Sequence, residues 1–372
     1  MFAEALKFIW YDKAKMFGIL FGIILSLFLV GQQVMICLSL LGSTVSLATF
    51  NQEYIWVINE KSTQVGDFPF IDMRVGRSLY SVKGVTAVYP MVYGAGSLKK
   101  PDGTKVPLNL IGTQSPDFAG GPWRVIKGNP ENMLESNAII LDSKNKELGG
   151  NLELGDKFEF NGKQVVLRGL TYRTEGLGNS YAFTTIERAR YLCNIPTTQA
   201  SAFLVKWDPE YSPEAVVNNI ANTIPRIKAR TGKDFRSESL SYFAANSGIV
   251  ASFGLLVVFA VITGFAIVGL TMYSAVSDRI KDYGTLKAIG GNNWSIRKLI
   301  LSQAALYSVV GFLIAWGLLK AFINATKDSL ELQLIPEILY SLIGVTLFIA
   351  VVGSLFGMRK ITKLEPAAVF RG

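Results

Sequence analysis

Residues 239–277 read SLSYFAANSGIVASFGLLVVFAVITGFAIVGLTMYSAVS, and none of them is Asp, Glu, Lys or Arg. A helix rises about 1.5 Å per residue, so about 20 residues cross the roughly 30 Å hydrocarbon core of a bilayer. This stretch is therefore long enough to cross a membrane as one helix. Half of the 372 residues are hydrophobic and the mean hydropathy is +0.32, which soluble domains rarely show.

Three further uncharged stretches have the same property: residues 16–52, 299–319 and 338–358. Together the four predict transmembrane helices at 16–46, 246–276, 299–319 and 338–358. The chain between the first two has mixed polarity and is long enough to bury a core of its own. We therefore expect a membrane α-helical protein with four transmembrane helices per protomer and a large α+β extracytoplasmic domain, residues 47–245, between helices 1 and 2.

Basic residues predict the orientation in the membrane. They gather in three short segments beside the predicted helices, whereas the short loop 320–337 carries both signs. Lys and Arg in short loops favour the cytoplasm, so both termini are expected inside and the large domain outside. The net charge of +9 then indicates membrane lipids and no nucleic acid. The basic residues are Lys7, Lys13, Lys15, Arg279, Lys281, Lys287, Arg297, Lys298, Arg359, Lys360, Lys363 and Arg371.

The remaining segments follow from this orientation. Residues 1–15 are amphipathic and predict a cytoplasmic interfacial helix, and 359–372 a cytoplasmic tail. The first apolar run is too long for a cleaved signal and is interpreted as a retained anchor. Cys37 and Cys193 fall in different regions and are not expected to pair. The chain has no histidine, which excludes His-based triads and the usual zinc sites.

The extracytoplasmic domain is predicted to mix strands and helices. Asn161-Gly162 between two short β-type runs predicts a hairpin, and Ser212-Pro213 predicts the start of a helix. No nucleophile with a base, paired carboxylates or phosphate loop gathers here, so nothing indicates catalysis. The predicted strands are residues 85–92, 106–110, 138–141, 157–160, 164–168 and 203–207.

A short amphipathic helix is predicted within the cytoplasmic segment 277–298. Its apolar residues Ile280, Tyr283, Leu286 and Ile289 have helical spacing, and Gly290-Gly291 can end it. The apolar face could lie on the lipid interface or fill a groove on a soluble partner. Spacing alone leaves the two interpretations equally open.

The run SDRIKDYGTLKAIGG, residues 277–291, resembles the coupling segment of the FtsX/MacB superfamily of ABC transporter permeases. The DevC-type permeases are similar at two further places, WYDKAK at 10–15 and MRK at 358–360 with EPAAVF at 365–370. The resemblance covers the membrane segments at both ends and is weak through the outer domain. Gln303 is a departure, because many of these permeases carry Glu there, and no ion pair is expected at that position.

This resemblance implies a homodimer that works with a separate ABC-type ATPase subunit, which uses ATP and Mg. The chain has no G-x-x-x-x-G-K-[ST] loop, so we expect a transport subunit that binds no cofactor itself and is not an enzyme. Tyr283 and Leu286 are expected to be buried anchors in the ATPase, with charges at the rim. The expected ATPase-coupling residues are Asp278, Arg279, Asp282, Tyr283, Leu286, Lys287 and Gly290.

The DevC-type resemblance further implies a bacterial inner-membrane exporter with a periplasmic membrane-fusion adaptor and an outer-membrane channel. The exported substrate would be a lipid, glycolipid, peptide or drug-like molecule. Two alternatives stay open: a lipoprotein-releasing permease, and a non-transporting regulator of a cell-wall hydrolase, which usually has a smaller outer domain. Small-residue pairs that would allow close helix packing, within the chain or at a dimer contact, are Gly18 with Gly22 and Gly353 with Gly357.

Overall fold

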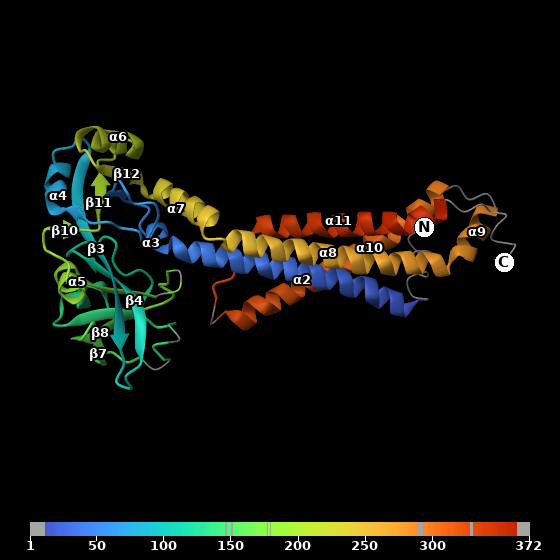
Figure 1. Cartoon of the computed structure of the whole chain (residues 1–372), viewed down its shortest axis with the longest axis horizontal. Coiled ribbons are helices and arrows are strands. Elements are labelled where there is room, and N and C mark those ends of the chain that lie inside the picture. Colours follow the sequence, from blue (N-terminus) through green and yellow to red (C-terminus); the bar gives the residue numbers. More distant parts are fainter. Residues whose placement is uncertain are drawn as a thin grey trace. The chain divides into compact units, whose positions relative to one another are not determined.

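The structure is a computed structural model that describes residues 12–145, 147–149, 152–176, 178, 180–288, 293–327 and 330–362. The chain divides into two compact units. The first, here called the helical unit, lies within residues 1–39 and 248–372, and the second, the sheet domain, spans residues 40–247. Figure 1 labels the elements of both units.

Long apolar helices make up most of the helical unit, and α9 (Ile280–Ala288) follows the second of them. Each long helix is long and apolar enough to cross a membrane, which makes this a multi-pass membrane protein. The predicted fold class is confirmed, since the sheet domain is inserted between the first long helix and the others. The long helices are α2 (Lys13–Thr44), α8 (Ile249–Asp278), α10 (Asn293–Thr326) and α11 (Pro336–Thr362).

Helix α10 extends beyond the uncharged run 299–319 at both ends. It includes Arg297, Lys298 and Lys320, because Lys and Arg are good helix formers whose long side chains can carry their charge to a membrane surface. Uncharged runs thus mark only the central part of each helix. The predicted helix 1–15 and the tail 359–372 lie largely outside the described residues, as does Gly290.

Helices α2 and α11 approach α8 closely through glycines. A Cβ on Gly22 would stand 2.7 Å from Cγ2 of Ile267, and one on Gly18 would stand 3.3 Å from Cγ2 of Thr271. In α11, a Cβ on Gly353 would stand 3.0 Å from Cγ1 of Val268. These glycines pack helices within one chain, as small residues do in membrane bundles. Gly357 lies in α11, but its surroundings are not among those described.

We expect Gly22→Leu to destabilise the helical unit by about 1–3 kcal/mol, because the added side chain must displace Ile267 in a tightly packed contact. Gly42→Leu is the matched control on the same helix, since a Cβ there would meet no atom within 4 Å. Thermal unfolding of the two purified variants makes the comparison. Equal melting temperatures would contradict the close packing of α2 on α8.

The sheet domain is built around one mixed sheet. Ten of the described strands form it, in the order β12-β1-β11-β3-β4-β9-β6-β8-β5, with β7 beside β3 and β8. Pairs β4–β9 and β6–β8 are parallel. Its strands are β1 (Ile55–Asn59), β3 (Val85–Lys99), β4 (Lys105–Thr113), β5 (Val125–Lys127), β6 (Ala138–Asp142), β7 (Lys157–Phe160), β8 (Lys163–Thr171), β9 (Ser180–Thr185), β11 (Ala202–Trp207) and β12 (Ile227–Thr231), and a small ladder pairs β2 (Ile71–Asp72) with β10 (Gln199–Ala200).

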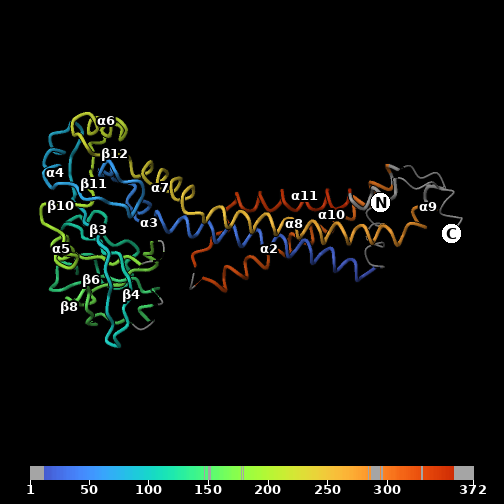
Figure 2. The backbone as a smooth tube through the Cα atoms, in the orientation of Figure 1, coloured from blue at the N-terminus to red at the C-terminus, as the bar shows by residue number. Residues whose placement is uncertain are grey.

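Helices lie beside the sheet (Figure 2). Their side chains form separate core clusters with those of the strands. Strand β1 is buried on both sides: Ile55 and Val57 belong to the cluster of α4 and α6, while Trp56 and Ile58 belong to that of α7. Helix α5 packs with β3 and β4 in a third cluster. The helices are α3 (Ser46–Thr49), α4 (Met73–Leu79), α5 (Ile186–Cys193), α6 (Pro213–Thr223), α7 (Gly232–Asn246) and the 3-10 turn η1 (Pro130–Leu134).

The local predictions in this domain are confirmed. Strands β7 and β8 pair antiparallel around Asn161-Gly162, and Asn161 has the positive φ of 50° that this turn requires. Ser212 caps α6 by accepting a hydrogen bond from the Ala215 backbone N–H at 3.2 Å. Each of the six predicted strands lies within or overlaps an observed one.

Candidate functional site

The segment predicted to couple to the ATPase begins where α8 ends. Helix α8 stops at Asp278, Arg279 is its C-cap with φ −105°, and α9 starts at Ile280. The backbone hydrogen bond from Tyr283 N–H to Arg279 O, 3.1 Å, closes the first turn of α9. A short helix is thereby set off from α8 by a single non-helical residue, and it leads along the chain to α10.

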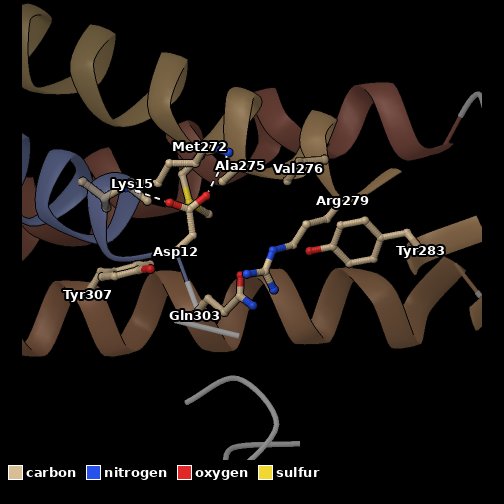
Figure 3. A pocket seen from close by; sticks show the side chains of 10 residues that line it. Asp12, Lys15, Met272, Ala275, Val276, Arg279, Tyr283, Gln303 and Tyr307 are labelled. Atoms are coloured by element: carbon tan, nitrogen blue, oxygen red, sulfur yellow. Dashed lines mark hydrogen bonds and ion pairs between the residues drawn. The ribbon is translucent and has the colours of Figure 1, made fainter. Parts of the chain in front are cut away.

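An ion-pair cluster joins the beginning of α2 to the end of α8. Lys15 Nζ lies 2.9 Å from Asp12 Oδ2 (Figure 3). It also contacts the carboxylate of Asp278. The Lys15 backbone N–H donates a hydrogen bond to Asp12 Oδ1 at 3.3 Å, so the Asp12 carboxylate also accepts a backbone hydrogen bond at the N-terminus of α2. This hydrogen bonding to Lys15 lowers the pKa of Asp12. The Lys15 side chain is 19% exposed and that of Asp278 is 62% exposed.

Beside this cluster, a cavity of about 30 Å³ has room for about one water molecule. Arg279, Tyr283, Gln303 and Tyr307 lie around it in Figure 3. Among the described residues, the site holds two carboxylates, Asp12 and Asp278, and two cations, Lys15 and Arg279, so their charges balance and the neutral Gln303 suits it. The complete lining is Asp12, Lys15, Ile19, Met272, Ala275, Val276, Arg279, Tyr283, Gln303 and Tyr307.

Tyr283 is oriented differently from the partner-facing anchor expected from the sequence. Only 3% of it is exposed, and it belongs to the core shared by the long helices. Burial raises the pKa of its phenol. The physical reason is helical spacing: Tyr283 lies on the face of α9 toward the unit, whereas Lys281, Asp282 and Thr285 are exposed.

The structure thus brings three of the predicted residues, Asp278, Arg279 and Tyr283, into one cluster, and leaves Asp282 on the exposed face. Leu286 and Lys287 lie in α9, but their side chains are not among those described. Sequence reasoning used Lys15 only for the membrane orientation and within the motif at residues 10–15, and gave no role to Tyr307. The motif at residues 10–15 contained a signal for Lys15, while Tyr307 looks like any aromatic in an apolar helix.

Comparison with known proteins gives one family match and several similar solved structures. Residues 254–366 match the family described as FtsX-like permease C-terminal, and this range includes α9, α10, α11 and most of α8. The chain is also similar to the periplasmic region of MacB from Actinobacillus actinomycetemcomitans, at 12% identity over 50% of this chain and 92% of that one, with a TM-score of 0.39.

A further similar structure is the extracellular domain of the ABC-type transporter YknZ from Gram-positive bacteria. It is 14% identical over 48% of this chain and 99% of that one, with a TM-score of 0.36. The family match covers the segment whose motif carried the predicted resemblance, and that prediction is confirmed at the level of the superfamily. The DevC-type likeness stays a prediction. The helices that follow the sheet domain therefore match those of the FtsX-like permease family over residues 254–366.

Proposed function

We propose that this chain is the membrane subunit of an ATP-driven export complex, in which a separate ATPase binds α9. One observation carries the proposal. Helix α9 buries Tyr283 among the long helices while it exposes Lys281, Asp282 and Thr285. A short helix with one fixed face and one exposed polar face suits a connector between a soluble partner and a membrane bundle.

The orientation belongs to the same proposal. The positive-inside rule puts α9 and both termini in the cytoplasm and the sheet domain outside, in the periplasm of a bacterial cell. The ATPase would bind ATP and Mg, and this chain would bind neither. Two copies of each subunit would make the working complex.

Transmission of motion follows from the contacts around α9. Tyr283 and Arg279 tie α9 to the helical unit, and Lys15 ties the end of α8 to the beginning of α2. A displacement of α9 would therefore act on α2 and α8 together. Along the chain, these are the two helices that connect to the sheet domain, through α3 and α7 respectively. The sheet domain would then act on the substrate, with a periplasmic adaptor and an outer-membrane channel as the partners that the DevC-type likeness implies.

Labelling of introduced cysteines tests this proposal. In a Cys37→Ala, Cys193→Ala background, we expect Thr285→Cys to react with a membrane-impermeant maleimide only after spheroplasts are permeabilised. Asp102→Cys, exposed in the turn between β3 and β4, should react in intact spheroplasts. A maleimide–benzophenone reagent on Thr285→Cys should then cross-link to the co-expressed ATPase upon illumination.

Each arm has an outcome that contradicts the proposal. Reaction of Thr285→Cys from the outside would remove the orientation and the coupling role together. Reaction only from the inside, but without any cross-link while the ATPase remains in the complex, would remove the coupling role of α9 alone.

A further inference from the structure

A groove of about 510 Å³ lies in the sheet domain, within the size range of small-molecule sites, roughly 300–1,000 Å³. Three segments form it: the chain that follows α3, the loop from β4 to β5, and the beginning of η1. The coupling proposal does not use this groove. Its lining comprises Phe50, Asn51, Glu53, Tyr54, Pro116, Asp117, Phe118, Ala119, Gly121, Pro122, Trp123, Asn129, Pro130 and Glu131.

Buried hydrogen bonds hold the groove in shape. Asn51 is 5% exposed; its Oδ1 accepts from the Gly120 backbone N–H at 3.0 Å, and its Nδ2 donates to Leu47 O at 2.9 Å. The Asn51 backbone oxygen in turn accepts from Trp56 Nε1 at 3.1 Å. One side chain therefore fixes the β4–β5 loop to the end of α3. A groove formed in advance lowers the ordering cost of binding a ligand.

One wall of the groove is aromatic and rigid. The rings of Trp123 and Phe50 are stacked, with centroids 5.1 Å apart and planes 12° apart. Behind them, Trp123 meets the edges of Tyr181 at 5.7 Å and Phe183 at 5.2 Å. Rings held in this way offer flat apolar area, and aromatic faces attract cations.

The charged groups that line the groove are all acidic: Glu53, Asp117 and Glu131. Lys206 Nζ binds Asp117 Oδ1 at 3.3 Å and offsets that charge. Within the part of the chain that the structure describes, Glu53 and Glu131 form no ion pair. Arg124 does not line the groove, although its guanidinium lies 4.9 Å from the ring centroid of Phe50. Two exposed carboxylates are thus left beside an aromatic wall.

We propose that this groove binds a cationic amphipathic small molecule. The apolar body of the ligand lies against the wall of Phe50 and Trp123, and its positive charge lies near Glu53 and Glu131. This proposal does not depend on the proposed ATPase coupling. A binding measurement on this chain tests it and requires neither ATP nor a partner protein.

Two probes of the same shape and opposite charge make the sharpest test. The full chain in lipid nanodiscs is dialysed against tetraphenylphosphonium or tetraphenylborate, and binding to empty nanodiscs is subtracted. We expect saturable binding of the cation, at least about tenfold tighter than that of the anion at low ionic strength. Equal binding of both probes, preference for the anion through Arg124 and Lys206, or absence of saturation would overturn the proposal.

A paired substitution locates the binding. The variant Glu53→Gln with Glu131→Gln keeps the shape of the groove, and both side chains are exposed, so the fold is preserved. We expect it to weaken cation binding about tenfold, since each exposed carboxylate contributes modestly. Glu210→Gln with Glu214→Gln removes the same charge elsewhere on the domain and should leave binding unchanged. An equal loss of cation affinity in both double variants, or no loss in the first, would contradict the placement of the ligand in this groove.

Discussion

Charge reversal in Lys15→Glu is expected to abolish most of the stimulation of ATP hydrolysis by the permease. The Lys15 ammonium contacts Asp12 and Asp278, so the variant would bring three carboxylates together where one ammonium now lies between two carboxylates. Losing two partly exposed ion pairs costs about 2 kcal/mol at most, which is about 30-fold in an equilibrium constant. Repulsion between like charges adds to this. ATP hydrolysis by the complete complex in nanodiscs is the measurement.

Two controls separate this effect from a general change of charge. Lys13→Glu makes the same change of charge on the same turn of α2, but Lys13 is exposed and forms no ion pair within the described residues. The Lys13→Glu permease should therefore stimulate ATP hydrolysis normally. The exchange Lys15→Asp with Asp278→Lys restores an opposite pair and should recover part of the stimulation. Equal damage from Lys13→Glu, or an exchange no better than Lys15→Asp alone, would contradict the role of this cluster.

Truncation of Trp56 is expected to have the largest effect on stability, about 3–5 kcal/mol of unfolding free energy in the sheet domain. Trp56 is fully buried, and its ring packs on Phe235 at 5.1 Å and Phe68 at 6.1 Å. Trp56→Ala leaves a cavity and also removes the hydrogen bond to the Asn51 backbone oxygen. Proteolysis of the full chain in increasing urea, with the helices kept in nanodiscs, measures this loss.

Trp207→Ala is the matched control for that measurement. Trp207 ends β11 and is only partly buried, so its truncation should cost clearly less. Because Asn51 also holds the groove, Trp56→Ala should weaken binding of tetraphenylphosphonium as well. Equal urea midpoints for the two variants would contradict the central place of Trp56 in this core.

Much of the fold could be predicted because its signals are local. An uncharged run of sufficient length specifies a membrane helix by composition alone, and Asn161-Gly162 specifies a hairpin by its turn chemistry. Strand β1 gave no such signal. Its residues Ile55 to Ile58 are all buried, since helices cover both faces, so they do not alternate between apolar and polar.

Only part of the site could be predicted, because the sequence shows local signals and not contacts between distant residues. The motif at residues 277–291 identified α9, but the Lys15–Asp278 contact joins residues 263 positions apart in sequence. Such a contact depends on how α2 and α8 pack, which no local pattern encodes. The motif also marked Tyr283 as an apolar residue of the segment. Whether it faces a partner or its own chain depends on the orientation of α9, which the nine-residue helix does not specify by itself.

The pairing of β1 with β12 has a practical consequence. Ile55 lies opposite Thr231 in that ladder, so the chain enters and leaves the sheet domain at the same end of two adjacent strands. Domains whose ends are neighbours tolerate excision and transplantation. Residues 40–247 therefore form a cassette: a short Gly–Ser bridge could replace it, and the cassette of a related permease could be grafted in its place to exchange recognition while the helices stay the same.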